Sequence, residues 1–162
     1  MAFNKDAFLQ QTVAAALDTK RIPFPDGTHD EGIVIKDLSL NSGTVKDGEN
    51  AGKTWAQLTI IYKSNDPDVR KEMNVADDQD ATVRQQLFLD LTDDGMLDVS
   101  PGRNIALGKV RLAAGQNTDE EWTMLDLKGA AVGGIQVKHN INKDTQDVYA
   151  EVTSVFAEDS DE

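Results

Sequence analysis

Aromatic and basic side chains recur in segments of this sequence that are rich in β-forming residues. Flat aromatic rings can stack on the bases of a single nucleic-acid strand, and cations beside them can follow its phosphates. The residues with this character are Lys53, Trp55, Tyr62, Lys63, Arg84, Gln86, Phe88, Arg103 and Lys138. Each cation alone also fits an ordinary solvated surface charge. The predicted chemistry, non-covalent binding of a single strand, therefore depends on the set gathering on one face.

The facing of these residues follows from strand geometry, in which successive side chains point to opposite sides. In the segment 83–91, Arg84, Gln86 and Phe88 share one side, and the leucines on the other side form the core face. An outward Phe88 also fits packing under a loop or a partner subunit. Trp55 and Tyr62 are seven residues apart, so we expect one in the core and the other exposed.

Residues suited to catalysis or metal binding are few. The chain has no cysteine and only His29 and His139, with no ligand spacing between them. It contains neither a phosphate-binding Gly-x-x-x-x-Gly-Lys-Ser/Thr loop nor a Gly-x-Ser-x-Gly nucleophile turn. We therefore predict a protein that is not an enzyme and holds no cofactor or metal.

The segment starting at Asp90 resembles the beginning of a calcium-binding loop. Oxygen-bearing side chains stand at alternating positions, namely Asp90, Thr92 and Asp94, and Gly95 follows. The twelfth position of such a loop needs a bidentate glutamate, and here it is Pro101. We interpret the segment as a β-turn with solvated carboxylates.

The periodicity of apolar residues predicts the elements that carry these side chains. An amphipathic N-terminal helix is expected within residues 1–21, ending before the Pro-Phe-Pro run, and a second helix at 104–114. Strands are predicted at 32–40, 54–63, 83–91, within 126–140 and at 147–156. Residues 41–53 and 64–82 are interpreted as loops.

This order of elements predicts a mainly β protein with an OB-fold-like domain at residues 22–156. Its five strands would form a partly open barrel, with a helix between strands three and four and an extra N-terminal helix. OB-folds commonly bind oligonucleotides on the face of strands two and three. The N-terminal helix would either cap the barrel or join two copies into a homo-oligomer.

Composition fits one soluble domain but disfavours a simple basic DNA binder. The 162 residues carry a formal net charge of −13, and 39% are hydrophobic. Affinity for phosphates comes largely from lysine and arginine, so binding requires the basic residues to gather locally. We find no apolar run of membrane-spanning length and no secretion signal, and the absence of cysteine fits a cytoplasmic location.

Residues 157–162 read Ala-Glu-Asp-Ser-Asp-Glu and are predicted to be a disordered acidic tail. One interpretation is a plain solubilising terminus. The other is a tag that mimics nucleic acid and recruits replication or recombination proteins. The residues assigned to such partner binding are Glu158, Asp159, Asp161 and Glu162.

Several segments resemble a phage-encoded family, long of unassigned function, that lies among replication and recombination genes and is often described as single-stranded DNA-binding proteins. The likeness covers residues 22–157 and is carried by segments 22–27, 52–60, 84–91, 102–111, 127–129 and 137–138. The resemblance implies an OB-type fold and sequence-independent binding of single-stranded DNA in the cytoplasm of the host cell. The low basicity outside the tail departs from a typical DNA binder.

Two other classes of function also fit the sequence. A phage structural or assembly protein would share the acidic composition and the β-rich segments. An acidic protein that mimics DNA and inhibits a nucleic-acid enzyme would bind that enzyme and ignore DNA.

Overall fold

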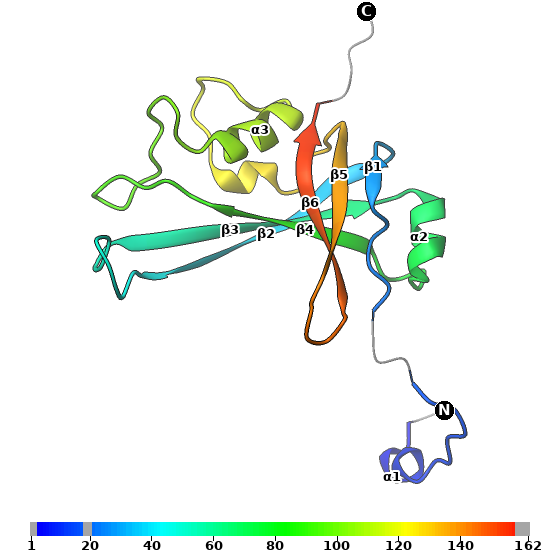
Figure 1. Cartoon of the computed structure of the whole chain (residues 1–162). Helices are drawn as coiled ribbons and strands as arrows, with labels where there is room; N and C mark the ends of the chain where they lie inside the picture. Colours follow the sequence, from blue (N-terminus) through cyan, green and yellow to red (C-terminus); the bar gives the residue numbers. More distant parts are fainter. Residues whose placement is uncertain (1–2, 18–20, 158–162) are drawn as a thin grey trace, which may run out of the picture.

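The computed structural model describes residues 3–17 and 21–157, and it is mainly β (Figure 1). Its strands are β1 (Gly27–His29), β2 (Ile33–Thr44), β3 (Thr54–Ser64), β4 (Ala81–Phe88), β5 (Gly134–Ile141) and β6 (Val148–Phe156). Its helices are α1 (Lys5–Leu9), α2 (Pro67–Met73), α3 (Ile105–Ala113) and the 3-10 helix η1 (Met124–Leu127). The predicted mainly β class is confirmed.

The six strands form one open mixed sheet in the order β1-β5-β6-β4-β3-β2. β4 and β6 pair in parallel, and the other neighbours pair antiparallel. The prediction of five strands missed β1, which adds a short edge strand beside β5. The sheet is not a closed barrel. However, main-chain hydrogen bonds join Ile33 and Ile35 of β2 to residues 129–132 just before β5.

One face of the sheet is packed and carries the core. Ile35, Ile60 and Tyr62 from β2 and β3 are fully buried, as are Val110 of α3 and Leu127 of η1. In Figure 1, α3 and the chain that follows it lie on one side of strands β2 to β4, and none of the helices in residues 3–17 and 21–157 covers the other side. This arrangement leaves a sheet face open to solvent.

The N-terminal helix is much shorter than predicted. α1 covers Lys5–Leu9 with Gln10 as its C-cap, and residues 11–17 are not helical. Asn4 caps the helix by accepting a hydrogen bond from the amide of Ala7. All described residues from 3 to 17 are exposed, so no tertiary packing extends the helix.

Two segments predicted as loops contain regular structure. β2 continues to Thr44, and its register with β3 runs without interruption from Asp37. Helix α2 lies within the predicted connection 64–82, where the Asp66 side chain caps the helix and Pro67 occupies its first turn. The predicted helix at 104–114 agrees with α3, and the last predicted strand agrees with β6. β5 begins only at Gly134, after η1 and a turn.

Candidate nucleic-acid interface

Strand β4 divides its side chains between the core and solvent as predicted. Val83 and Leu87 are buried, whereas Arg84, Gln86 and Phe88 are exposed. Phe88 keeps 71% of its surface accessible, although an aromatic ring of this size is normally covered. The exposed row of β4 therefore carries the flat Phe88 ring and the Arg84 guanidinium group, with Gln86 between them on the same side of the strand.

The antiparallel register places β3 side chains beside this row. Gln57 pairs with Phe88, Thr59 with Gln86 and Lys63 with Thr82. Trp55, two residues before Gln57, lies on the same side. Its ring centroid is 6.4 Å from that of Phe88, with the ring planes at 68°. An aromatic pair thus lies at one end of the exposed row.

Gly43 of β2 makes room for the Trp55 indole. The two residues are register partners, and a Cβ atom on Gly43 would lie 2.8 Å from three atoms of the indole ring. The ring therefore lies directly against the β2 backbone. Sequence analysis missed this role because residues 41–53 were interpreted as a loop. Beyond Leu40 the sequence reads Asn-Ser-Gly-Thr, so no apolar alternation marked the continuation of the strand.

On the other side of β4, the row continues into β6 and β5. Arg84 is the register partner of Glu151, and Glu151 is the register partner of Lys138. The Glu151 carboxylate accepts a hydrogen bond from the Asn140 side chain at 2.5 Å. Arg84 has no hydrogen-bond or ion-pair partner within the described part of the chain. Its guanidinium is available to a ligand.

We call this surface the open face. Six of the nine side chains predicted to bind nucleic acid share it, namely Trp55, Lys63, Arg84, Gln86, Phe88 and Lys138. Lys53 lies at the hairpin end of β3, where its carbonyl accepts a hydrogen bond from Val45. It is exposed and two residues from Trp55, so it can extend the open face at that end.

Tyr62 is a correction to the predicted set. Its side chain is fully buried on the core face, and its hydroxyl donates a 2.7 Å hydrogen bond to Oε1 of Gln85. Burial raises the pKa of this hydroxyl above its ordinary value. Tyr62 therefore cannot stack on a ligand in the folded protein. Of the two rings expected on opposite sides of the sheet, Tyr62 is the one in the core, and Trp55 lies on the other side.

Arg103 lies outside the strands of the sheet, in the turn before α3. It lines a small hollow together with Asp90, Asp93 and Asp98. A hydrogen bond from Ser100 holds the pKa of the Asp98 carboxyl below its ordinary value. These carboxylates offset the charge of Arg103 locally, so we do not include it in the interface.

The segment that resembled a calcium loop uses its polar groups to join β4 to α3. Asp90 accepts a hydrogen bond from the amide of Asn104, and Asn104 Oδ1 accepts one from the amide of Asp90, both at 2.8 Å. Among residues 3–17 and 21–157, no three carboxylates or histidines gather into a group that could hold a metal ion.

The two histidines each bind a backbone carbonyl. His29 Nε2 lies 2.7 Å from the carbonyl oxygen of Pro25, and His139 Nε2 lies 2.7 Å from that of Phe24. These contacts secure the chain leading into β1 at the edge of the sheet. Both imidazole rings therefore have a structural role.

Two ion pairs lie at the β2 side of the sheet. Lys36, at a bulge in β2, is 3.0 Å from Asp80, and Lys128 is 3.5 Å from Asp37. The hydrogen bond from Lys36 holds the pKa of the Asp80 carboxyl below its ordinary value, and the nearby charge of Lys63 acts in the same direction. These carboxylates limit the positive potential at that edge, whereas Arg84 has no ion-pair partner among residues 3–17 and 21–157.

Comparisons with protein-family models, with curated proteins and with solved structures found no match. In the part of the chain that the structure describes, no helix is both long and apolar enough to cross a lipid bilayer.

Proposed function

We propose that this protein binds single-stranded DNA without sequence preference through the open face. The observation that carries the proposal is the Trp55–Phe88 ring pair, with Phe88 exposed and Trp55 half-buried. It lies in the same row as Arg84, which has no hydrogen-bond or ion-pair partner among the described residues. Every base has a flat π face, so stacking on such rings is tolerant of sequence. Arg84, Lys63 and Lys138 would follow the phosphates.

The exposure of the two rings indicates a different role for each of them on the open face. Phe88 is the more accessible ring and would stack on a base directly, while half-buried Trp55 supports the stack from β3. Gln57 and Gln86 can exchange hydrogen bonds with base edges or sugars. No bond is made or broken, so binding requires no cofactor.

The topology supports an OB-type interpretation of the domain. Strands β2 to β6 include a helix, α3, between the third and fourth of the five, and the third and fifth pair in parallel. The hydrogen bonds from β2 to residues 129–132 connect the β2 edge to the chain just before β5, which supports a partly open barrel. On this interpretation, β3 and β4 supply the face that OB-folds commonly use for oligonucleotides.

The biological setting that we propose is phage replication or recombination, in the cytoplasm of the host cell. The resemblance of residues 22–157 to the phage-encoded family supports it. The acidic residues assigned to the tail lie outside the described residues from position 158 onward. We propose that they recruit replication or recombination proteins.

The decisive experiment measures fluorescence anisotropy of labelled oligo-dT and of a matched duplex at low and moderate salt. We expect tight binding to the single strand alone, weakened strongly by salt because phosphate contacts release counterions. No binding to either nucleic acid by folded protein at low salt would reject the proposal. That result would direct attention to the structural, assembly or DNA-mimic alternatives.

A further inference from the structure

Tyr149 of β6 is a further exposed aromatic residue of the sheet, and it was not among the residues predicted to bind nucleic acid. Its side chain keeps 52% of its surface accessible. In the part of the chain that the structure describes, neither its hydroxyl nor its ring has a bonding or ring partner. The Tyr149 ring is therefore available to a ligand.

Strand register places Tyr149 on the open face. Val152 of β6 is buried in the core, whereas Tyr149 and Glu151 are exposed. Glu151 is the register partner of Arg84, so the alternate residues of β6 share the side of the sheet on which Arg84 lies. Tyr149 is in turn the register partner of Asn140 in β5. The open face therefore has aromatic rings on both sides of Arg84.

The β5–β6 hairpin carries Tyr149 away from the Trp55–Phe88 pair. In Figure 1 this hairpin projects from strands β2 to β4 on the side opposite to α3. Phe88 lies four residues from Arg84 along β4, and Tyr149 lies two residues from the partner of Arg84 along β6. At about 3.3 Å per residue, these paths are about 13 Å and about 7 Å long. The two ring positions can thus contact different bases of one strand, but not the same base.

Cations lie between the two ring positions. Arg84 of β4 and Lys138 of β5 are the register partners of Glu151 on its two sides. The Glu151 carboxylate accepts a hydrogen bond from the Asn140 side chain, and among the described residues it forms no ion pair with either cation. A strand that runs from one ring position to the other would therefore pass two available cations, which suits its phosphates.

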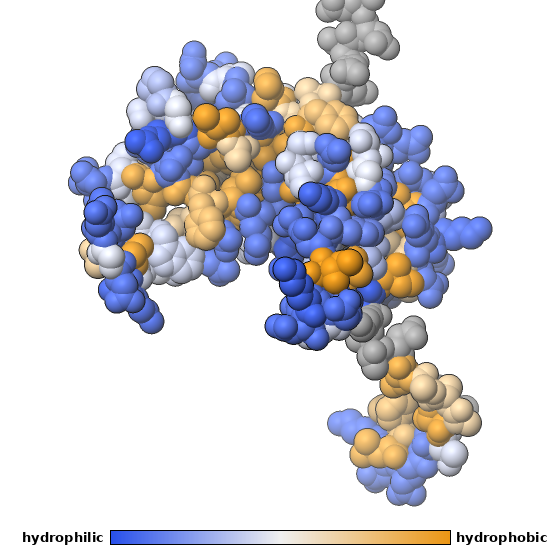
Figure 2. Space-filling view, viewed as in Figure 1, coloured by the Kyte–Doolittle hydropathy of each residue, from blue (hydrophilic) through white to orange (hydrophobic). Residues whose placement is uncertain are grey.

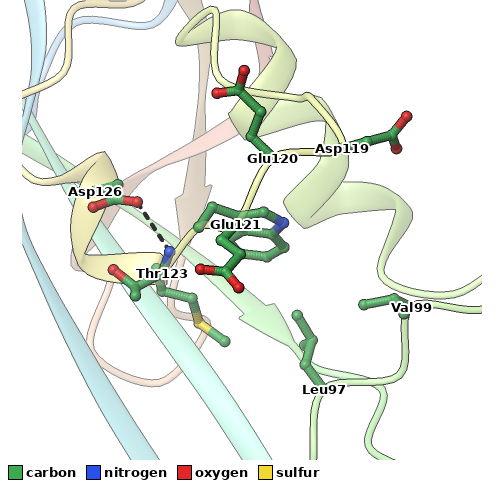
Figure 3. Close-up of a pocket in the computed structure, with 9 residues that line it drawn as sticks. Leu97, Val99, Asp119, Glu120, Glu121, Thr123 and Asp126 are labelled. Atoms are coloured by element: carbon green, nitrogen blue, oxygen red, sulfur yellow. Dashed lines mark hydrogen bonds between the residues drawn. The ribbon is translucent and has the colours of Figure 1, made fainter.

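Two other groups of aromatic residues at the surface lie off this path. Phe3 and Phe8 belong to the N-terminal segment that carries α1, which Figure 2 shows set apart from the body of the molecule. Trp122 lines a depression beside α3, and the carboxylates of Asp119 and Glu120 lie at the same depression (Figure 3). These carboxylates would repel phosphates, so neither group competes with Tyr149 as a stacking position.

We propose that Tyr149 is a second base-stacking position, and that the single strand crosses the sheet from the Trp55–Phe88 pair, past Arg84, to the β5–β6 hairpin. This role rests on the proposed function and adds to it a course for the strand. It also sets a minimum length, because a strand too short to bridge the two positions can occupy only one of them.

Anisotropy of labelled oligo-dT tests the stacking role of Tyr149. With an oligonucleotide of about twelve residues, Tyr149→Ala should weaken binding roughly fivefold or more, because the stacking of one base is lost. Tyr149→Phe keeps the ring and should bind as the wild type does. Ile141→Ala is the matched control, since Ile141 is 60% exposed on the same hairpin and alternation places it on the other side of the sheet. It should leave the affinity unchanged.

The length of the oligonucleotide separates the two ring positions. A dT trimer is too short to bridge paths of about 13 Å and about 7 Å, so it can gain little from the presence of both. Lengthening the oligonucleotide from a trimer to a dozen nucleotides should therefore raise the affinity of the wild type more than that of Tyr149→Ala. An equal rise in both proteins would overturn the proposal.

Fluorescence gives a readout that a purely structural role of Tyr149 would not change. The chain has two tryptophans, so Tyr149→Trp in a Trp55→Phe/Trp122→Phe background carries a single indole. Addition of oligo-dT should quench it, because a stacked base quenches indole emission. Ile141→Trp in the same background should show much less quenching, and equal quenching at both positions would contradict a specific contact.

Glu151 tests the course of the strand. Glu151→Gln removes a negative charge between Arg84 and Lys138 and keeps an acceptor for Asn140, so the affinity for oligo-dT should rise several-fold at low salt. Glu120→Gln changes the net charge equally beside α3 and should give a smaller gain. Equal gains would show that the strand does not cross β6 at Glu151.

The outcomes distinguish this role from the proposed function. If the folded wild type binds no oligo-dT at low salt, both fail. If the wild type binds and Tyr149→Ala binds equally well at every length, only the second stacking position fails. Equal losses in Tyr149→Ala and Tyr149→Phe would assign the contact to the hydroxyl and overturn stacking.

Discussion

Phe88 and Trp55 are the residues on which the proposed function depends most directly. Alanine at either position removes a ring surface from the open face while leaving the core side of the sheet intact. We expect the affinity for oligo-dT to fall by about 1–3 kcal/mol for each ring that stacks on a base. Fluorescence anisotropy at fixed salt concentration measures the change.

Leu125→Ala provides the matched control for this prediction. Leu125 is 72% exposed on η1 and lies outside the open face. Its replacement should leave the affinity unchanged. Wild-type affinity in folded Phe88→Ala and Trp55→Ala proteins would exclude stacking on this pair.

Tyr62 is expected to act on stability alone. Tyr62→Phe leaves the buried Oε1 of Gln85 without its 2.7 Å donor, which typically costs about 1–3 kcal/mol. Affinity for oligo-dT should not change, because Tyr62 faces the core. Urea unfolding and anisotropy on the same preparation distinguish the two effects.

Burial of Tyr62 also predicts a pH dependence. Because its pKa is raised in the folded protein, the unfolded chain loses this proton first as the pH increases. The stability contribution is therefore complete below about pH 10, the ordinary tyrosine pKa, and declines above it. Tyr62→Phe should lose less stability than the wild type between neutral and alkaline pH. An equal loss in both proteins would contradict this assignment.

At the scale of elements, the β2–β3 hairpin positions the aromatic pair. Gly43→Ala places a methyl group within 2.8 Å of the indole, so the Trp55 ring must move off the β2 backbone. We expect a red shift in Trp55 fluorescence, measured against a Trp55→Phe control, and weaker binding of oligo-dT. Circular dichroism should remain that of the folded sheet.

Thr44→Ala tests whether the effect is specific to Gly43. Thr44 is the neighbouring exposed residue of β2, and its replacement keeps the indole site open. It should bind oligo-dT as the wild type does. If Gly43→Ala shifts the fluorescence of Trp55 but not the affinity, the indole supports the hairpin without contacting the ligand.

At the scale of the whole molecule, the net charge of −13 opposes phosphate binding. Truncation of residues 157–162 removes four carboxylates that we propose compete with DNA for the open face. We expect the affinity for oligo-dT to rise several-fold at low salt, and the gain to shrink as salt screens the charges. Anisotropy titrations of both proteins over a salt series measure this.

A charge-matched variant separates competition from net charge. Asparagine at Asp77, Asp78, Asp93 and Asp94 removes the same number of charges from exposed turns of the body. If this variant gains as much affinity for oligo-dT as the truncation, the gain comes from the change in net charge, and the tail does not compete specifically for the open face.

The sequence by itself determined the local elements and their facing. Strict alternation in β4 predicted the buried and exposed rows, because a pleated strand allows no other division once one face is apolar. The prediction of a helix at 104–114 agrees with α3, although the Asn104 side chain accepts a hydrogen bond from the amide of Asp90 instead of capping the helix. Asp66 and Pro67 also marked the start of α2, although the acidic composition of residues 64–82 favoured a loop.

The tertiary structure decided which of these local features meet. Strand register brought Trp55 to Phe88 and carried the row across β4 into β6 and β5, and no spacing along the chain encodes that pairing. The tertiary structure also placed half-buried Trp55 on the open face and Tyr62 in the core. Helix α1 stopped at Leu9 although its apolar pattern continues. A pattern fixes where a side chain points, but packing against a partner surface supplies the free energy that makes the element form.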